Sequence, residues 1–338
     1  MKRVSRLTWG GFVCLLLVAC AEPPTAQAEL VFGTICSINL YEQGSPKIYE
    51  TLFSRLREID LTMSATKADT AVDRINQNAG IRPVPVPPDL MEVLEQALTY
   101  AALSEGAFDP TVGPLVQCWA IGSENPRIPE ALEIEESLSL IDWQDVVIDR
   151  EAATVFLRRP GMALDLGAIT KGYAADEMAE LLQKAGITRA IIDLGGNIVA
   201  YGTKSQDEPW RIGIQDPLDS RGSYLGILTV RHKSVVTSGV YERYAEIDGK
   251  RYHHILSTQD GYPVSKGLLS VTIIADRSIE ADALSTAAFA LGYEKGRALV
   301  ESMDHAEAIF VFEDKQIRGT SGALAWFTLK DPQFSLNP

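Results

Sequence analysis

Asp282 and Thr286 are two oxygen-bearing residues whose types and spacing suit a divalent cation. They stand four positions apart in the segment 281–286, so both side chains lie on one face if this segment is helical. A carboxylate and a hydroxyl are hard oxygen donors, and a backbone carbonyl and phosphate oxygens would complete the octahedron that Mg²⁺ requires. The pair also has a structural interpretation, in which Asp282 stabilises the helix dipole and Thr286 fills the core. Both interpretations stay open on this pair alone.

A glycine-containing segment, 165–176, predicts a passage from an extended stretch into a helix. It reads Asp-Leu-Gly-Ala-Ile-Thr-Lys-Gly-Tyr-Ala-Ala-Asp. Glycine lets the backbone approach a ligand, and a helix N-terminus presents free N–H groups to an anion. The alternative is an ordinary strand-to-helix connection that is capped by Thr170.

His254 is a candidate proton acceptor on the second strand of a predicted hairpin. Strands over 244–247 and 250–256 are joined by Asp248-Gly249, a pair suited to a turn with positive φ. Alternation along the second strand places Tyr252, His254 and Leu256 on one face. An imidazole there can accept a proton, although a single histidine on a strand is more often structural.

Other signatures of catalysis and metal binding are missing from the sequence. It contains no Gly-x-Gly-x-x-Gly after a strand, no phosphate loop, no His-Glu-x-x-His and no Gly-x-Ser-x-Gly. Rossmann and phosphate-loop functions are therefore excluded. The absence of Cys-x-x-Cys argues against zinc, and Cys36 and Cys118 either form a disulfide or are both buried.

The elements that must position these residues are predicted from apolar spacing. Helices are expected at 47–61, 89–104, 171–185 and 278–291, the last with Ser278 as its N-cap. Strands are expected at 146–149, 154–158, 190–194, 210–215, 269–275 and 308–312. Because many adjacent strands are joined by short turns rather than helices, the predicted fold class is α+β, with mixed, largely antiparallel sheets and packed helices in one compact unit.

The N-terminus resembles that of a bacterial lipoprotein. Residues 1–19 combine three basic residues with an apolar run that is too short to span a bilayer. The run ends in Leu-Val-Ala-Cys, which resembles a lipobox whose cysteine, Cys20, carries the lipid. We expect residues 1–19 to be a removed signal peptide and 20–30 a lipidated tether, so that the protein is anchored to a bacterial membrane and faces the periplasm or the exterior.

The net charge argues against nucleic acid as a partner. It is −14 for the whole sequence, and the loss of Lys2, Arg3 and Arg6 with the signal, where no acidic residue occurs, brings it to −17. Such a field repels a polyanion, and no block of Lys or Arg offsets it. A ligand that carries phosphates must therefore be held by metal, by backbone N–H groups or by single cations.

Short segments spread over nearly the whole mature chain carry a resemblance to a known family. They are 32–34, 63–64, 74–76, 106–115, 165–176, 193–197, 210–217, 237–244, 254–255, 261–264 and 281–286. In this order and spacing the sequence resembles the ApbE family of FAD:protein FMN transferases. The resemblance implies an ApbE-like catalytic domain over 31–330 that binds FAD as substrate together with Mg²⁺.

The resemblance also implies roles for particular residues. Mg²⁺ would be held by the carbonyl of Thr170 and the side chains of Asp282 and Thr286. His254 would accept the proton of a Thr or Ser hydroxyl on acceptor flavoproteins with a Ser/Thr-Gly-Ala-Ser/Thr-like motif, and AMP would leave. His254 and Asp282 are thus the expected catalytic residues, and the isoalloxazine would lie near 106–108. The expected FAD contacts are Phe32, Thr66, Gly106, Ala107, Phe108, Asp109, Gly167, Lys171, Tyr173, His254 and Leu256.

The sequence departs from the family pattern at three places. Phe32 replaces the usual Met before Gly-Thr, 257–261 replaces the usual Asp-Pro-Arg-Thr-Gly, and the loop 65–69 lacks the aromatic residue often found there. An open loop would leave the pyrophosphate accessible to water, so hydrolysis of FAD to FMN and AMP is an alternative activity. A second alternative is a non-catalytic FAD-binding lipoprotein, which would have no need of a metal at the phosphates.

Overall fold

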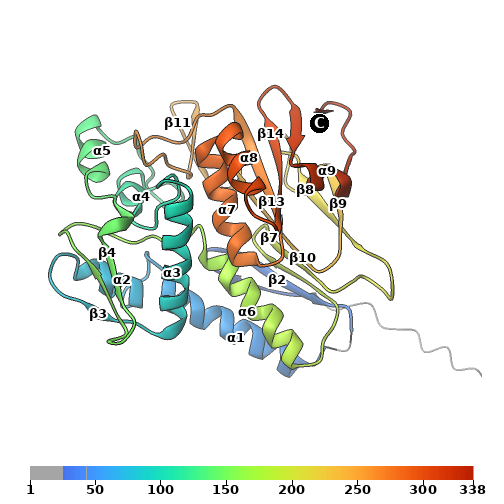
Figure 1. Cartoon of the computed structure of the whole chain (residues 1–338), viewed down its shortest axis with the longest axis horizontal. Coiled ribbons are helices and arrows are strands. Elements are labelled where there is room, and N and C mark those ends of the chain that lie inside the picture. Colours follow the sequence, from blue (N-terminus) through green and yellow to red (C-terminus); the bar gives the residue numbers. More distant parts are fainter. Residues whose placement is uncertain (1–25, 43, 338) are drawn as a thin grey trace, which may run out of the picture.

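A nine-stranded sheet forms the centre of the molecule in the computed structural model, which describes residues 26–42 and 44–337 (Figure 1). Its strand order is β1-β2-β6-β7-β10-β13-β14-β15-β17, and all neighbours are antiparallel except the parallel pair β15–β17. The strands are β1 (Ala26–Val31), β2 (Thr34–Leu40), β6 (Ala190–Leu194), β7 (Asn197–Tyr201), β10 (Lys233–Gly239), β13 (Leu268–Ala275), β14 (Ala306–Phe312), β15 (Gln316–Gly319) and β17 (Ser335–Leu336).

Both faces of this sheet are covered, because its central strands are apolar on both sides. In β13, Val271 and Ile273 pack into the large core under the helices, whereas Ile274, the next residue, packs into a second core on the opposite face. The small sheet β16-β9-β8 and α9 (Ser321–Trp326) cover that opposite face. Its strands are β8 (Trp210–Gln215), β9 (Tyr224–Val230) and β16 (Phe327–Leu329).

The helix layer contains the elements that were predicted to position the site. It comprises α1 (Pro46–Met63), α2 (Ala71–Gln77), α3 (Pro88–Leu103), α6 (Thr170–Lys184), α7 (Ser278–Leu291) and α8 (Tyr293–Glu301). The predicted helices agree with α1, α3, α6 and α7 to within two residues at each end. None of the helices in the described ranges 26–42 and 44–337 is long and apolar enough to cross a membrane.

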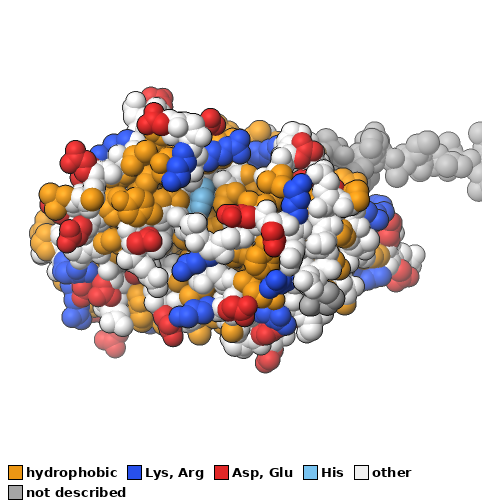
Figure 2. All heavy atoms as spheres, turned by 90° about the horizontal axis from the view of Figure 1, so that it is seen from above, with side chains coloured by type: hydrophobic (Ala, Val, Ile, Leu, Met, Phe, Trp, Pro, Cys, Tyr) orange, Lys and Arg blue, Asp and Glu red, His pale blue; other side chains and the backbone are white. Residues whose placement is uncertain are grey.

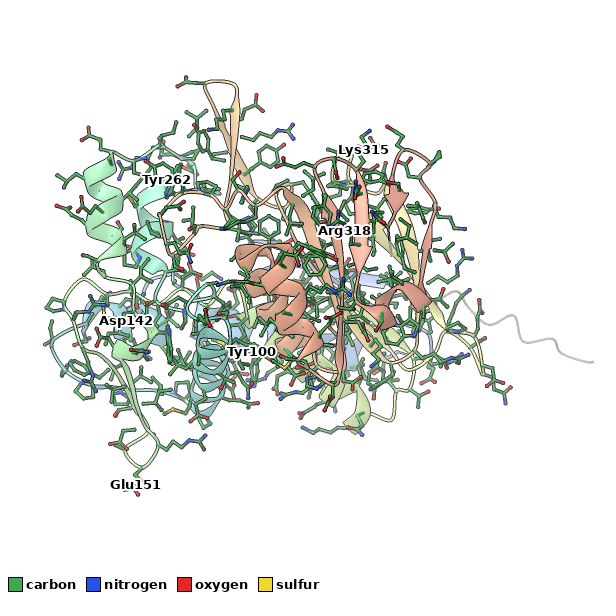
Figure 3. All side chains as sticks on the ribbon, turned by 45° about the horizontal axis from the view of Figure 1, so that its top comes forward. Tyr100, Asp142, Glu151, Tyr262, Lys315 and Arg318 are labelled. Carbon is green, nitrogen blue, oxygen red and sulfur yellow. The ribbon has the colours of Figure 1, made fainter. Side chains whose placement is uncertain are left out.

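A smaller region packs beside this layer, and Tyr252 of the hairpin β11–β12 packs against its core. Its core consists of Leu115, Trp119, Ile134 and Leu256. Tyr262 packs edge-on to Trp119 with 5.8 Å between ring centroids (Figure 3). The elements of this region are α4 (Gly113–Trp119), α5 (Ala131–Leu138), β11 (Tyr244–Ile247) and β12 (Lys250–His253). The 3-10 helix Trp143–Asp145 and the small sheet of β3 (Val84–Pro85), β4 (Val146–Asp149) and β5 (Thr154–Leu157) pack against the main core instead.

The hairpin turn is confirmed, but its second strand is shorter than expected. Asp248 and Gly249 have φ of 53° and 75°, as the turn requires. β12 ends at His253 rather than at Leu256. Leu256 packs instead into the small core of α4 and α5, so the expected strand alternation does not extend to it.

The tether expected at 20–30 overlaps with the first strand of the fold. Residues 1–19 and Cys20 lie outside the described residues, but β1 begins at Ala26 and pairs with β2 from Ala26↔Asn39 to Val31↔Thr34. Main-chain groups that are hydrogen-bonded in a sheet belong to the fold, so the prediction is wrong for residues 26–30. Cys36 and Cys118 are both free and buried, which settles the alternative left open by the sequence.

Candidate active site

Helices α6 and α7 cross at Gly172, where there is no space for a side chain. A Cβ atom placed on Gly172 would clash with the carbonyl oxygen of Ser278 and would lie 2.6 Å from Cα of Ile279 and 2.8 Å from Cβ of Asp282. Main-chain atoms cannot move aside without shifting the helix, so this close approach requires glycine. As a result, Asp282 of α7 lies against the first turn of α6.

Asp176 of α6 caps α7 at the same crossing. Its carboxylate accepts the N–H groups of Ser278 and Ile279 at 2.7 and 3.1 Å. These are donors that the first turn of a helix leaves without an intrahelical partner. The expectation that Ser278 caps α7 is therefore wrong, and its hydroxyl donates instead to Oδ1 of Asn197 at 2.9 Å.

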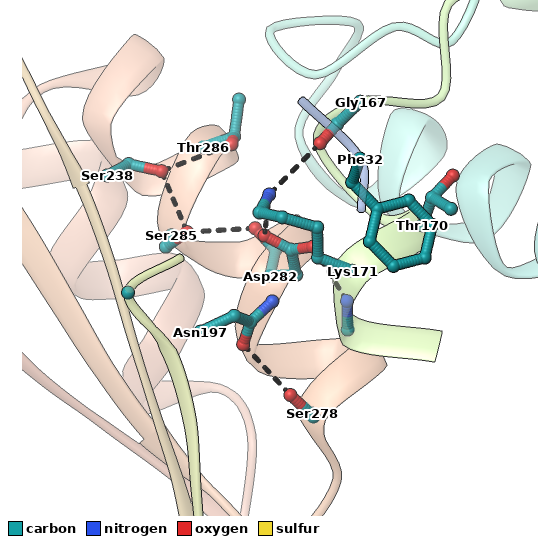
Figure 4. Close-up of polar contacts among 12 residues, drawn as sticks. Phe32, Gly167, Thr170, Lys171, Asn197, Ser238, Ser278, Asp282, Ser285 and Thr286 are labelled. Atoms are coloured by element: carbon teal, nitrogen blue, oxygen red, sulfur yellow. Dashed lines mark hydrogen bonds and ion pairs between the residues drawn. The ribbon is translucent and has the colours of Figure 1, made fainter. Parts of the chain in front are cut away.

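Asp282 connects α7 back to α6 and contacts a cation. Its Oδ2 accepts the N–H of Gly172 at 2.9 Å, and its Oδ1 lies 3.5 Å from Nζ of Lys171 (Figure 4). Nζ of Lys171 also donates to the carbonyl of Gly167 at 3.2 Å. The carboxylate thus stabilises the N-terminus of α6 rather than that of its own helix. An ammonium held between a carboxylate and a carbonyl marks this position as one that favours positive charge.

Thr286 lies one helical turn beyond Asp282, in a cluster of hydroxyl groups. Its Oγ1 is 3.2 Å from Oγ of Ser238 in β10, and that oxygen is 2.8 Å from Oγ of Ser285. Ser285 in turn donates to the carbonyl of Asp282 at 2.9 Å. Thr286 is only partly buried, so it is not the core filler of the structural interpretation.

Thr170 is the buried first residue of α6, next to Lys171. Its hydroxyl donates to the carbonyl of Leu166 at 2.9 Å, so the side chain does not cap the helix as the structural interpretation expected. No group of three or more His, Cys, Asp or Glu side chains within the described residues could hold a metal. A metal near Asp282 would therefore need main-chain, hydroxyl and substrate oxygens as further ligands.

His254 is held in one tautomer by a main-chain carbonyl. The carbonyl of Arg243 accepts both the N–H and the Nδ1–H of His254, at 3.1 and 3.0 Å. Nε2 makes no hydrogen bond with any described residue, so it is left as the proton acceptor. Burial lowers the pKa of the imidazole from 6.5 to about 4, which keeps it neutral at physiological pH.

Phe32 occupies the turn between β1 and β2, and in Figure 4 its ring points toward the first turn of α6. Its φ is +55°, followed by +68° at Gly33. Oδ2 of Asp60 accepts the Phe32 N–H at 3.3 Å, and Nη2 of Arg243 donates to the Phe32 carbonyl at 3.1 Å. Thr66 is exposed in the loop that follows α1.

Four of the residues predicted to contact FAD have buried side chains. Phe108, Tyr173 and Leu256 belong to the hydrophobic cores. Asp109 is 7% exposed, and its carboxylate accepts the N–H groups of Thr111 and Trp143 at 2.8 and 3.1 Å. These four side chains pack in the interior and do not reach the surface of the site in this structure. Gly106 and Ala107, by contrast, are partly exposed.

A groove of about 450 Å³ opens beside Ala107 at the C-terminal end of α7. It begins at Ala290, one turn beyond Thr286. Thr258 on its wall donates to the carbonyl of Gly106 at 2.8 Å, which ties the 257–261 segment to the predicted flavin region. Figure 2 shows the side of the molecule on which the β11–β12 hairpin stands, where hydrophobic side chains gather between lysine and arginine side chains.

Arg243 and Ser238 were not predicted as site residues. Arg243 precedes β11 and joins His254 to the β1–β2 turn, and Ser238 joins Thr286 to β10. Both belong to the 237–244 segment that carried part of the family resemblance, which was the available signal. Their roles depend on contacts across distant elements, so residue type alone did not identify them.

Comparison with known proteins places the chain in a family. The ApbE family profile matches residues 32–310. An FAD:protein FMN transferase of Treponema pallidum (strain Nichols) is 38% identical over 328 residues, which cover 92% of this chain and 91% of that protein. One of Klebsiella pneumoniae (strain 342) is 36% identical over 86% of this chain and 90% of its own length.

Solved structures agree with this placement. The ApbE protein of Thermotoga maritima superposes with a TM-score of 0.82 at 32% identity, covering 90% of this chain and 99% of that one. The flavin transferase ApbE from Vibrio cholerae gives a TM-score of 0.80 at 27% identity, over 90% and 100%. The chain therefore belongs to the ApbE family, and it is an enzyme of the flavin transferase class. The predicted α+β fold and the family resemblance are both confirmed.

Proposed function

We propose that the protein transfers FMN from FAD to a Thr or Ser hydroxyl of acceptor flavoproteins that carry a Ser/Thr-Gly-Ala-Ser/Thr-like motif, with release of AMP. The observation that carries the proposal is the Gly167–Lys171–Asp282 contact, a position that favours positive charge between two helices, one turn away from the hydroxyl of Thr286. The names of the relatives, FAD:protein FMN transferase, support the same reaction.

Mg²⁺ fits the oxygen atoms present at this position. The carboxylate Oδ1 of Asp282, the hydroxyl of Thr286 and the main chain of Thr170 offer hard oxygen donors, and Lys171 already places a cation on the carboxylate. When bound, Mg²⁺ would neutralise charge on the FAD pyrophosphate. Such neutralisation would offset the repulsion between the pyrophosphate and the overall negative charge of the protein.

The residues of the chain have separate tasks in the proposed reaction. Lys171 offsets phosphate charge, and the fixed tautomer of His254 leaves Nε2 free to take the proton of the acceptor hydroxyl. The hydroxyl oxygen forms a bond to the phosphorus of the FMN half as the bond from that phosphorus to the bridging oxygen of the pyrophosphate breaks. The electron pair of the broken bond leaves with AMP, and the proton remains on His254.

Mass spectrometry of a mixture of the protein, FAD, Mg²⁺ and a candidate acceptor tests this proposal. The acceptor should gain the mass of FMN less water, with one AMP for each modified acceptor. EDTA should stop the reaction and added Mg²⁺ should restore it. AMP release without a mass gain on any acceptor would contradict transfer, and neither product would indicate a protein that only binds FAD.

Hydrolysis of FAD to FMN and AMP is the second candidate activity, and one observation favours it. Thr66 is exposed and stands in a loop, 65–69, without an aromatic side chain to cover the site. Water would reach the pyrophosphate there when no acceptor is bound. The same experiment without acceptor measures this activity as the rate at which FMN and AMP appear.

We further propose that residues 1–19 are removed and that Cys20 is lipidated, which would anchor the protein to a bacterial membrane with its catalytic domain in the periplasm or at the exterior. The basic residues, the short apolar run and the Leu-Val-Ala-Cys ending support this. Labelling of cells with a fatty-acid probe tests it. Cys20→Ser should abolish label on the protein, whereas Cys14→Ser, a cysteine within the removed signal, should leave it unchanged.

A further inference from the structure

Asp60 lies at the start of a chain of hydrogen bonds that ends at His254. It belongs to the last turn of α1, and its side chain is 10% exposed. Its Oδ2 accepts Nζ of Lys67 at 2.5 Å and the main-chain N–H of Phe32 at 3.3 Å. One oxygen atom therefore ties the 64–70 loop and the β1–β2 turn together.

The β1–β2 turn needs this support because of its backbone. Phe32 has φ of +55°, a left-handed conformation that a bulky side chain rarely adopts. Such a conformation persists where the surroundings hold it. Asp60 holds the N–H side of Phe32, and the guanidinium of Arg243 holds the carbonyl side.

Arg243 connects the β1–β2 turn to the imidazole of His254. Its side chain donates to the Phe32 carbonyl at 3.1 Å, and its own carbonyl accepts the N–H and the Nδ1–H of His254 at 3.1 and 3.0 Å. The residue that selects the His254 tautomer is thus fixed by the turn that Asp60 fixes. No other described side chain hydrogen-bonds to the main chain of Phe32.

We propose that Asp60 is a positioning residue for His254 and acts through Phe32 and Arg243. The inference rests on the proposed role of His254 as proton acceptor. Loss of Asp60 leaves the Phe32 N–H without its acceptor and releases Lys67, so the turn can relax and Arg243 loses its anchor. The orientation of His254 should then change, whereas the affinity for FAD should not.

Kinetics of matched variants test the proposal. Asp60→Ala should lower kcat for FMN transfer by about tenfold to a hundredfold, as expected for a misplaced catalytic group, with KM for FAD nearly unchanged. Asp60→Asn keeps an oxygen that can accept from Phe32 and should recover most of kcat. Glu50→Ala is the control, because it removes another ion-paired carboxylate from α1 and should change nothing.

A double-mutant cycle separates positioning from a general loss of structure. In a His254→Ala background, Asp60→Ala should cause no further loss of kcat, because the group that it positions is gone. A full additional loss in that background would overturn the proposal. If Asp60→Ala does not fold, the same cycle with Asp60→Asn decides, since its smaller effect should also vanish in the His254→Ala background.

Nitrogen NMR of the imidazoles gives a readout that does not depend on transfer. The spectrum of the wild type should show His254 protonated at Nδ1, with the resonance assigned by its loss in His254→Ala. Asp60→Ala should alter that resonance, and Glu50→Ala should not. An unchanged His254 resonance in Asp60→Ala would refute the inference, whereas a wild type that transfers no FMN would refute only the proposed function.

Discussion

The main-chain N–H of Gly172 donates a hydrogen bond to Oδ2 of Asp282 at 2.9 Å. The carboxylate proposed to bind Mg²⁺ is therefore also a structural group that joins two helices. Its second oxygen, Oδ1, remains directed at Lys171. Variants of Asp282 can separate these two tasks, since one oxygen serves each.

Asp282→Ala should abolish both FMN transfer and FAD hydrolysis. It should also lower the free energy of unfolding by about 1–3 kcal/mol, because the buried Gly172 N–H loses its acceptor. Asp282→Asn retains an acceptor oxygen and should regain the stability without regaining activity. Denaturant titration and product analysis measure the two effects, with Glu151→Ala at the β4–β5 turn as a control (Figure 3). Wild-type activity in Asp282→Asn would rule out the metal assignment.

Gly172→Ala should destabilise the protein by about 1–3 kcal/mol, since its Cβ would press against main-chain atoms of α7. The helices must separate to admit the methyl group, so transfer should fall as well. Gly186→Asn is a suitable control, because no atom lies within 4 Å of its Cβ position and Asn tolerates its φ of +73°. Equal unfolding free energies for Gly172→Ala and the wild type would show that the crossing is less tight than described.

The pH dependence of transfer should reflect the lowered pKa of His254. The neutral imidazole is the active form, and burial lowers its pKa from 6.5 to about 4. The rate should therefore stay level as pH falls through 6.5 and decline only near pH 4. The free energy of unfolding should follow the same direction. The contribution of His254 to it is fully present above pH 6.5 and is lost as pH falls through about 4. A rate that halves near 6.5 in the pH–rate profile would contradict this.

His254→Ala should slow transfer by roughly a hundredfold or more with little change in FAD affinity. Single-turnover rates and fluorescence titration of FAD measure the two quantities. His305→Ala is the matched control, since His305 pairs with Glu280 and has no contact with His254. An unchanged rate in His254→Ala would assign this imidazole a structural role.

Thr66→Tyr should suppress hydrolysis of FAD more than transfer, because an aromatic ring would cover the open loop. Thr66 is exposed, and its N–H donates to Oγ of Ser64 at 3.2 Å, a bond that the substitution preserves. Ala68→Tyr, in the same loop and also exposed, controls for an aromatic residue as such. Chromatography of FAD, FMN and AMP over time measures both rates. If the wild type leaves FAD intact for hours with Mg²⁺ present, another group already covers the site.

Local sequence signals predicted those features that neighbouring residues determine. The Asp248-Gly249 turn and the helices α6 and α7 depend on φ preferences and apolar spacing within a few residues. The Asp282–Thr286 pair could be placed on one face of a helix for the same reason. The order of the short motifs carried the family resemblance, and with it the fold.

Contacts between distant elements could not be predicted in this way. Ser278 has the residue type of an N-cap, but Asp176 from another helix occupies that role because the two helices cross at Gly172. Phe108 and Asp109 lie in a motif of the family, yet their side chains point into the interior. Arg243 acquires its position from the fold, which brings the β1–β2 turn to the hairpin that carries His254.

Because β1 starts at Ala26, the tether between a lipid on Cys20 and the folded domain would be short. Six residue steps span at most about 20 Å when fully extended. A folded chain of this size is about twice as wide as that. The catalytic domain of a lipidated protein would thus be confined to a thin layer along the bilayer. It would meet acceptors embedded in the same membrane by lateral diffusion along the bilayer. Freely diffusing acceptors would be reached only when they enter that layer.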